Sequence, residues 1–117
     1  MTLAKLFAKY GIPMSQDNAL QIGTYTITVS YDRRFRAIIV ENDFDNQSDL
    51  CITPKQAAST ILRMAENIVN ACFQQECHEI AQDCVNEGYP SHGSNYDMRV
   101  DQLENYYDEM FWFIYER

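Results

Sequence analysis

The first part of the chain changes from a helical to an alternating spacing of apolar residues. Helical spacing over residues 3–10 predicts a short amphipathic helix, which Thr2 caps and Gly11 ends. Alternation over residues 25–30 predicts a strand, and residues 35–41 form a second β-rich run. We expect the two runs to pair as an antiparallel hairpin.

A two-stranded hairpin is marginally stable in water, so this sheet needs further cover. Residues 20–22 are the candidate for a third strand, and the helices are expected to cover one face of the sheet. Residues 42–49 are polar and predict a loop that leads to the next helix.

The longest pattern in the chain predicts a helix with clear signals at both ends. Thr53 can cap the first turn, Pro54 suits the first helical position, and Gln56 completes a capping box. Gly88 permits a left-handed cap, and the proline two residues later prevents continuation.

The apolar stripe of this long helix changes face along its length. One face carries Ala58, Ile61, Ala65, Ile68, Val69 and Cys72. A face displaced by roughly 120° carries Cys77, Ile80, Ala81 and Cys84. Either the helix is interrupted or bent where the stripe changes, or its two halves pack on different partners. We expect an interruption or bend between Phe73 and Cys77.

A last helix is expected to begin at Asn95 or Asp97 and to run to about Tyr115. Its predicted core face comprises Leu103, Tyr106, Tyr107, Met110, Phe113 and Ile114. Together the elements predict an α+β fold with a short N-terminal helix, a two- or three-stranded antiparallel sheet, and long C-terminal helices packed on it. We expect a single domain over residues 1–117.

Composition and charge narrow the classes of function. The net charge of −8 argues against direct binding to nucleic acid or to an anionic membrane. The longest apolar run covers residues 110–115, whereas a membrane span needs roughly 20 residues. The N-terminus lacks the apolar region of a signal peptide. These features predict a cytoplasmic protein.

The spacing of the cysteines, histidines and loop acids does not favour a metal site or catalysis. The four cysteines are Cys51, Cys72, Cys77 and Cys84. Without a CxxC pair they are expected to be reduced core thiols, and no metal or cofactor is predicted. His78 and His92 have no partner fixed by spacing, and no phosphate-binding glycine loop or nucleophile elbow is present. The acidic loop at residues 43–49 lacks the glycine and the last glutamate of a calcium loop. We therefore predict no catalytic residue and no enzyme activity.

The acidic excess is confined to the C-terminal half. Residues 1–63 hold six acids and seven bases, whereas residues 64–117 hold eleven acids and two bases. The first acidic stripe consists of Glu76, Glu79, Asp83 and Glu87, and the second acidic stripe consists of Asp97, Asp101, Glu104 and Asp108. Neighbouring charges lie about one turn, roughly 5 Å, apart, which approximates a sparse track of DNA phosphates. The stripes are either a surface for a basic partner or solvated helix faces.

Aromatic and basic side chains add two further candidates. Trp112 and Tyr115 lie on the side of the second acidic stripe and can anchor an interface, unless another element covers them. Arg33, Arg34 and Arg36 lie at the predicted hairpin tip. They are an exposed tip, a contact for phosphate or an acidic surface, or partners of the acidic loop that follows.

In size, acidity, tyrosine content and striped carboxylates, residues 64–117 resemble phage-encoded inhibitors of bacterial defence, namely anti-CRISPR and DNA-mimicking anti-restriction proteins. The resemblance implies a non-enzymatic inhibitor in the host cytosol. It would occupy the basic, nucleic-acid-binding surface of an effector such as a CRISPR–Cas complex. The basic hairpin departs from pure mimicry and fits an inhibitor that wedges between subunits.

Two other classes of function compete with this interpretation. An immunity or antitoxin protein would use the same acidity to neutralise a nuclease-type toxin. A small metal-binding regulator is the third class, which a zinc assay would identify. For an inhibitor of a defence effector and for an immunity or antitoxin protein, the expected partner is a basic protein. The sequence leaves open whether the protein forms a homodimer.

Overall fold

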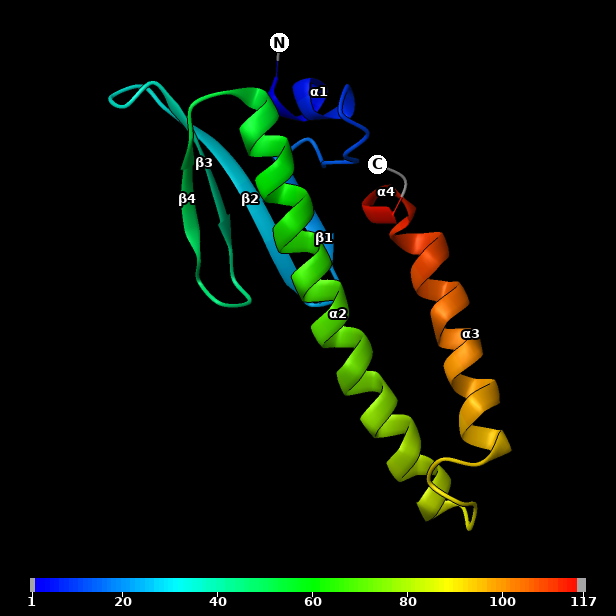
Figure 1. The fold of residues 1–117 in the computed structure, drawn as a ribbon. Helices are drawn as coiled ribbons and strands as arrows, with labels where there is room; N and C mark the ends of the chain where they lie inside the picture. The colour runs from blue at the N-terminus through cyan, green and yellow to red at the C-terminus, as the bar shows by residue number, and fades with distance from the viewer. Residues whose placement is uncertain (1, 116–117) are drawn as a thin grey trace. The chain divides into compact units, whose positions relative to one another are not determined.

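The computed structural model describes residues 2–115, which form four helices and four strands (Figure 1). The elements are α1 (Leu3–Ala8), β1 (Ala19–Ile22), β2 (Tyr25–Asp32), β3 (Ala37–Asn42), β4 (Ser48–Cys51), α2 (Pro54–Asn86), α3 (Ser94–Met110) and α4 (Trp112–Tyr115). This order confirms the predicted α+β fold, except that the sheet has four strands rather than two or three. No helix within the described residues is long and apolar enough to cross a membrane.

The chain forms two compact units, and the boundary between them falls within α2. Unit 1 ends at Ile68 and contains α1, the sheet and the first half of α2. Unit 2 begins at Val69 and contains the second half of α2, α3 and α4. The sequence predicts one domain over residues 1–117, whereas the structure groups the residues into these two units.

The sheet of unit 1 is antiparallel throughout, in the order β1–β2–β3–β4. Alternation along the strands places Leu20, Ile27, Val29 and Val40 on one buried face. The first half of α2 lies across the sheet (Figure 1), and Ile61 on this half is fully buried. The predicted hairpin and third strand are therefore present as β2, β3 and β1.

β4 is the strand that the sequence pattern misses, because its first two residues, Ser48 and Asp49, end a mostly polar stretch over residues 42–49. The N–H of Asn42 donates to the carbonyl of Gln47 at 3.1 Å. The side chain of Asn42 accepts from the N–H groups of Phe44 and Asp45 at 3.0 and 3.1 Å. These bonds complete the reversal within a few residues, so Ser48 onwards can pair with β3.

The ends of α2 match the sequence signals. Thr53 Oγ1 accepts from the N–H of Gln56 at 3.1 Å, and Gln56 Oε1 accepts from the N–H of Thr53 at 3.3 Å, which is the reciprocal pattern of a capping box. Past the other end of the helix, Gly88 has φ of +88°, a left-handed conformation that glycine adopts without strain.

Between these ends α2 is one continuous helix, so the predicted interruption between Phe73 and Cys77 is wrong. The stripe changes face because the two halves of the helix pack on different partners. Ile61 and Met64 are buried in unit 1. In unit 2, the ring of Phe73 contacts the ring of Tyr107 on α3, with 5.7 Å between centroids.

The last helical region differs from the single helix expected. α3 begins at Ser94 after an N-cap at Gly93, so Asp97 lies in the first turn, where its charge is favourable to the helix dipole. Phe111 has φ of −119° and ψ of 33°, which ends α3 and separates it from α4.

This interruption changes the core face of unit 2. Tyr107, Phe113 and Ile114 are buried as predicted, and Leu103 is half-buried. Tyr106 and Met110 are exposed, so their assignment to the core is wrong, and Phe111 is buried in addition. The non-helical backbone at Phe111 changes the direction in which the following side chains point.

Candidate protein-binding surface

Acidic side chains dominate the exposed surface of unit 2. The exposed acids are Glu79, Asp83, Glu87, Asp97, Asp101, Glu104, Asp108 and Glu109. Arg99 is the single lysine or arginine among residues 69–115, and it forms an ion pair with Glu87. No other acid of this unit takes part in an ion pair within residues 2–115. The remaining carboxylates therefore carry uncompensated negative charge.

Three members of the first acidic stripe are exposed, with Glu79 and Asp83 on α2 and Glu87 directly after its end, whereas Glu76 is not exposed. Glu76 is half-buried, its side chain forms a hydrogen bond with Tyr107, and its Oε2 is buried without a hydrogen-bond partner. The prediction that Glu76 lies on the solvent face is thus wrong. Glu76 lies at the border between the exposed face of α2 and the face that packs on α3. Its place in the contact between α2 and α3 follows from the position of α3, which the spacing along α2 does not reveal.

The contact with Glu76 alters the chemistry of Tyr107. Burial of the phenol raises the pKa of Tyr107, and the hydrogen bond and the charge of Glu76 raise this pKa further. The folded state therefore holds the Tyr107 proton more tightly than the unfolded state does. A raised pKa contributes stability below the unfolded-state pKa of about 10, and this stability is lost as pH rises above that value.

We expect Tyr107→Phe to be less stable than the wild type at pH 7 by about 1 kcal/mol, because the hydrogen bond with Glu76 is lost. Urea unfolding at increasing pH should show the wild type lose stability relative to Tyr107→Phe above pH of about 10, by up to about 1.4 kcal/mol per pH unit, so that the difference vanishes and then reverses. Groups that titrate alike in both proteins cancel. If the difference in stability between the wild type and Tyr107→Phe stayed constant with pH, the raised pKa of Tyr107 would be contradicted.

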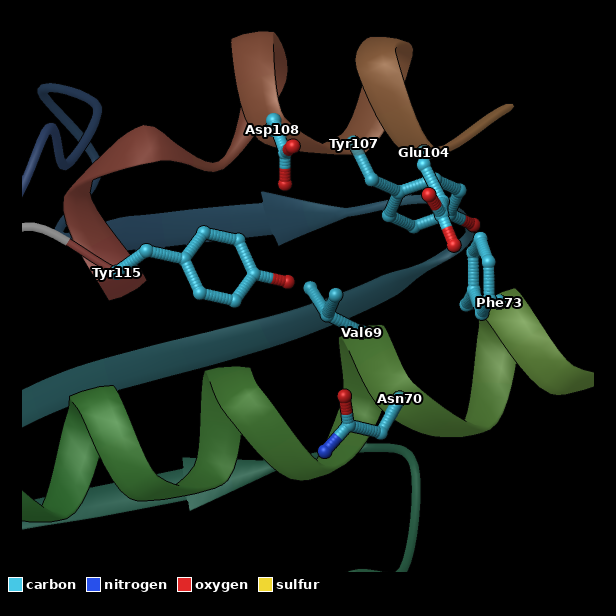
Figure 2. A pocket seen from close by; sticks show the side chains of 7 residues that line it. All are labelled: Val69, Asn70, Phe73, Glu104, Tyr107, Asp108 and Tyr115. Carbon is cyan, nitrogen blue, oxygen red and sulfur yellow. The ribbon is translucent and has the colours of Figure 1, made fainter. Parts of the chain in front are cut away.

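The second acidic stripe lies on α3, and all its members are exposed. Two of them, Glu104 and Asp108, also line a cleft of about 310 Å³ within unit 2. The other lining residues are Val69, Asn70, Phe73, Tyr107 and Tyr115 (Figure 2). Figure 2 shows the carboxylate of Asp108 and the hydroxyl of Tyr115 pointing into this cleft. Apolar walls with carboxylates suit the aliphatic stem and cationic head of lysine or arginine.

Trp112 and Tyr115 are both exposed, at 47% and 52% of their surface. They belong to α4, so they do not continue the helix face of the second acidic stripe. Tyr115 nevertheless shares the cleft with Glu104 and Asp108. The ring of Trp112 contacts Phe113 edge-on, with centroids 6.1 Å apart. The sequence reasoning identifies these aromatic side chains but not the cleft.

A second hollow of about 230 Å³ brings together a cysteine and two histidines, the residue types that could support catalysis or metal binding. Its lining residues are Phe73, Gln74, Cys77, His78, His92 and Tyr96. Burial raises the pKa of the Cys77 thiol, the opposite of what a nucleophilic thiolate requires. His92 lies against Tyr96, with ring centroids 4.6 Å apart. Within residues 2–115, no group of three or more histidine, cysteine or acidic side chains is arranged to hold a metal ion.

All four cysteines are free. Cys51 and Cys84 are buried, which confirms the predicted core thiols at these positions. Cys72 and Cys77 are only half-buried, so the core prediction fails in part for them. Burial also raises the pKa of Cys72, and the charge of Glu76 raises it further.

The basic hairpin tip is exposed, and the carboxylate of Asp32 stabilises its turn by accepting backbone hydrogen bonds. Asp32 Oδ1 accepts from the N–H groups of Arg34 and Phe35 at 2.8 and 3.1 Å. Arg33, Arg34 and Arg36 form no ion pair within the described chain, so the alternative in which they pair with the acidic loop is not observed.

Two acids of the loop at residues 43–49 accept hydrogen bonds from backbone N–H groups. Asp43 Oδ1 accepts from the N–H of Thr26 at 2.7 Å, and Asp45 Oδ1 accepts from the N–H of Gln47 at 3.0 Å.

Comparisons with protein-family models, curated proteins and solved structures give no match to this chain. Its function is therefore argued from its own residues alone.

Proposed function

We propose that the protein is a non-enzymatic inhibitor that binds a basic, nucleic-acid-binding surface of a bacterial defence effector, such as a CRISPR–Cas complex. The binding surface is the acidic side of unit 2, and the protein acts in the cytosol of the host cell. This proposal follows from the resemblance of residues 64–117 to phage-encoded inhibitors.

The observation that carries the proposal is the uncompensated charge of unit 2. Apart from Glu87, its exposed acids lack a cationic partner within the described residues. Like charges one turn apart on a helix cost a few tenths of a kcal/mol per pair. A surface needed only for solubility would interleave lysine at no such cost. A basic partner would relieve the repulsion and would be steered to this side by charge.

The cleft gives this surface a place for one specific contact. A lysine or arginine of the effector can place its cationic head between Glu104 and Asp108 and its stem along Val69 and Phe73. Trp112 and Tyr115, both exposed, supply aromatic surface of the kind that anchors interfaces. Glu76 is excluded from the proposed surface because it is engaged with Tyr107.

The test begins with capture of the partner by tagged wild-type protein from a bacterial lysate that contains defence effectors, followed by affinity measurement with the purified effector. One variant neutralises the exposed first stripe through Glu79→Gln, Asp83→Asn and Glu87→Gln. A second neutralises the second stripe through Asp97→Asn, Asp101→Asn, Glu104→Gln and Asp108→Asn. We expect each to bind at least about tenfold more weakly, and wild-type association to slow as salt rises.

The matched control neutralises exposed acids of unit 1 through Asp17→Asn and Glu41→Gln. It should bind within about twofold of the wild type, since it reduces the net negative charge without touching the stripes. All variants should keep a melting temperature close to that of the wild type, because the relief of repulsion offsets the loss of the Glu87–Arg99 ion pair and of the favourable Asp97 charge in the first turn of α3. If both stripe variants bind like the control, the carboxylates are plain solvated faces and the proposal fails.

A further inference from the structure

β1 and β4 form the two edges of the sheet in unit 1, and the edge at β4 lies beside a groove. β4 is the last strand in the sheet order, and no strand within residues 2–115 pairs with its other side. An open edge presents unpaired N–H and C=O groups that can bind another extended chain. β4 also lacks the lysine, proline or bulge that commonly blocks such an edge.

The pattern of hydrogen bonds shows which groups of β4 face outward. The bond from the N–H of Asn42 to the carbonyl of Gln47 makes these two residues a hydrogen-bonded pair. Hydrogen-bonded and non-hydrogen-bonded pairs alternate along an antiparallel ladder. From the register, Asp49 belongs to the next hydrogen-bonded pair, whereas Ser48 and Leu50 belong to non-hydrogen-bonded pairs. Ser48 and Leu50 therefore turn their N–H and C=O groups away from β3.

A groove of about 700 Å³ lies beside this edge. One wall is formed by β4 and its exit at residues 48–53, and the other by Lys55, Gln56, Ser59, Thr60 and Arg63 of α2. Side chains of an extended segment point alternately to the two faces of a sheet. Every second side chain of a strand added to β4 would therefore point toward this groove.

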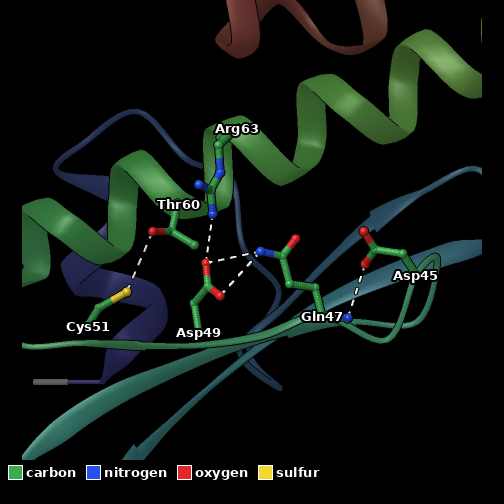
Figure 3. A network of polar contacts seen from close by, with 6 residues as sticks. All are labelled: Asp45, Gln47, Asp49, Cys51, Thr60 and Arg63. Atoms are coloured by element: carbon green, nitrogen blue, oxygen red, sulfur yellow. Dashed lines mark hydrogen bonds and ion pairs between the residues drawn. The ribbon is translucent and has the colours of Figure 1, made fainter.

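The groove is positively charged. Arg63 forms an ion pair with Asp49 at 2.6 Å, and the side-chain amide of Gln47 also donates to that carboxylate (Figure 3). Lys55 is exposed and forms no ion pair within the described chain. It lies in the first turn of α2, where the helix dipole adds positive potential. An acidic side chain is the complement of this groove.

The opposite face of the edge is apolar. Leu50 lies opposite Ile39 in the register and is 56% exposed. Side chains of an added strand on this face would contact Leu50 and remove apolar surface from water. The two faces together favour a segment in which acidic and apolar residues alternate.

We propose that β4 binds a short extended segment of a partner protein as a fifth strand, with acidic side chains in the groove beside α2 and apolar side chains against Leu50. A second copy of this chain fits less well. A two-fold dimer through β4 would bring the basic groove of each copy, with Lys55 and Arg63, toward that of the other. The site lies in unit 1 and is independent of the acidic surface of unit 2.

The probe is a fluorescein-labelled heptapeptide of alternating valine and glutamate with blocked ends. Its comparator carries lysine in place of glutamate. Fluorescence anisotropy with the full chain is measured at about 0.15 M salt, which screens the charge of the acids of unit 2 beyond about 8 Å. We expect the glutamate peptide to bind at least about tenfold more tightly than the lysine peptide.

The decisive variant is Leu50→Pro, which removes an outward N–H without breaking the ladder to β3. It should bind the glutamate peptide at least about tenfold more weakly. The matched control Leu50→Val keeps the N–H and should bind within about twofold of the wild type. Lys55→Glu, which leaves β4 unaltered and suits a helix N-terminus, should also lose at least about tenfold and remains informative if Leu50→Pro does not fold.

Three results would overturn the proposal. The first is no binding of the glutamate peptide up to about 1 mM, and the second is equal binding of the two peptides. The third is a dimer in light scattering that Leu50→Pro converts to a monomer, which would assign the edge to a second copy of this chain.

Discussion

Gln75→Pro is expected to lower the free energy of unfolding by about 3 kcal/mol or more. Gln75 is an exposed residue in the interior of the continuous helix α2. Proline there removes one backbone hydrogen bond, and its ring clashes with the carbonyl of residue 71. Urea denaturation followed by far-UV circular dichroism measures the loss, and the helical signal should fall as well.

The control for this substitution is Gln75→Ala, which deletes the same side chain but keeps the backbone N–H. It should alter stability by no more than about 0.5 kcal/mol, because the side chain is exposed and alanine favours helix. Equal stability of the proline and alanine variants would mean that the helix is interrupted between Phe73 and Cys77, as the apolar stripe alone suggests.

Ile61→Ala is expected to destabilise the protein by about 2–5 kcal/mol. Ile61 is fully buried in unit 1, on the part of α2 that lies across the sheet (Figure 1). Truncation removes buried apolar atoms and leaves a cavity that a close-packed core fills only in part. Denaturant unfolding at neutral pH measures the effect.

Ile52→Ala removes the same atoms from a residue that is 68% exposed, and it should cost no more than about 0.5 kcal/mol. Both substitutions replace isoleucine by alanine, so a difference in stability between the two variants reports the effect of burial alone. Similar losses at the two positions would contradict the burial of Ile61.

The sequence by itself determines the features that depend on residues a few positions apart. Thr53 and Gln56 cap α2 within one turn, and Gly88 adopts the left-handed conformation just beyond its end. The alternation in β2 and the helical spacing in α1 likewise reflect local geometry, so both elements are where the pattern predicts them. The acidic excess of unit 2 is also a property of the sequence alone.

Only the tertiary structure decides the features that depend on distant partners. β4 follows a mostly polar loop and has no clear alternation of its own, and it is a strand because β3 pairs with it. α2 stays continuous across a change of apolar face because the sheet covers one half and α3 the other, which no single-helix pattern can distinguish from a break.

The same reason explains what the sequence misses in the candidate site. Glu76 follows the spacing of the exposed stripe, yet the approach of Tyr107 takes it into an interface. Glu104 and Asp108 line a cleft because Tyr115, on a separate helix, reaches the same space. Side-chain spacing within one helix defines a face, but whether that face meets solvent, a cleft or another helix depends on residues far along the chain, whose positions are set by packing.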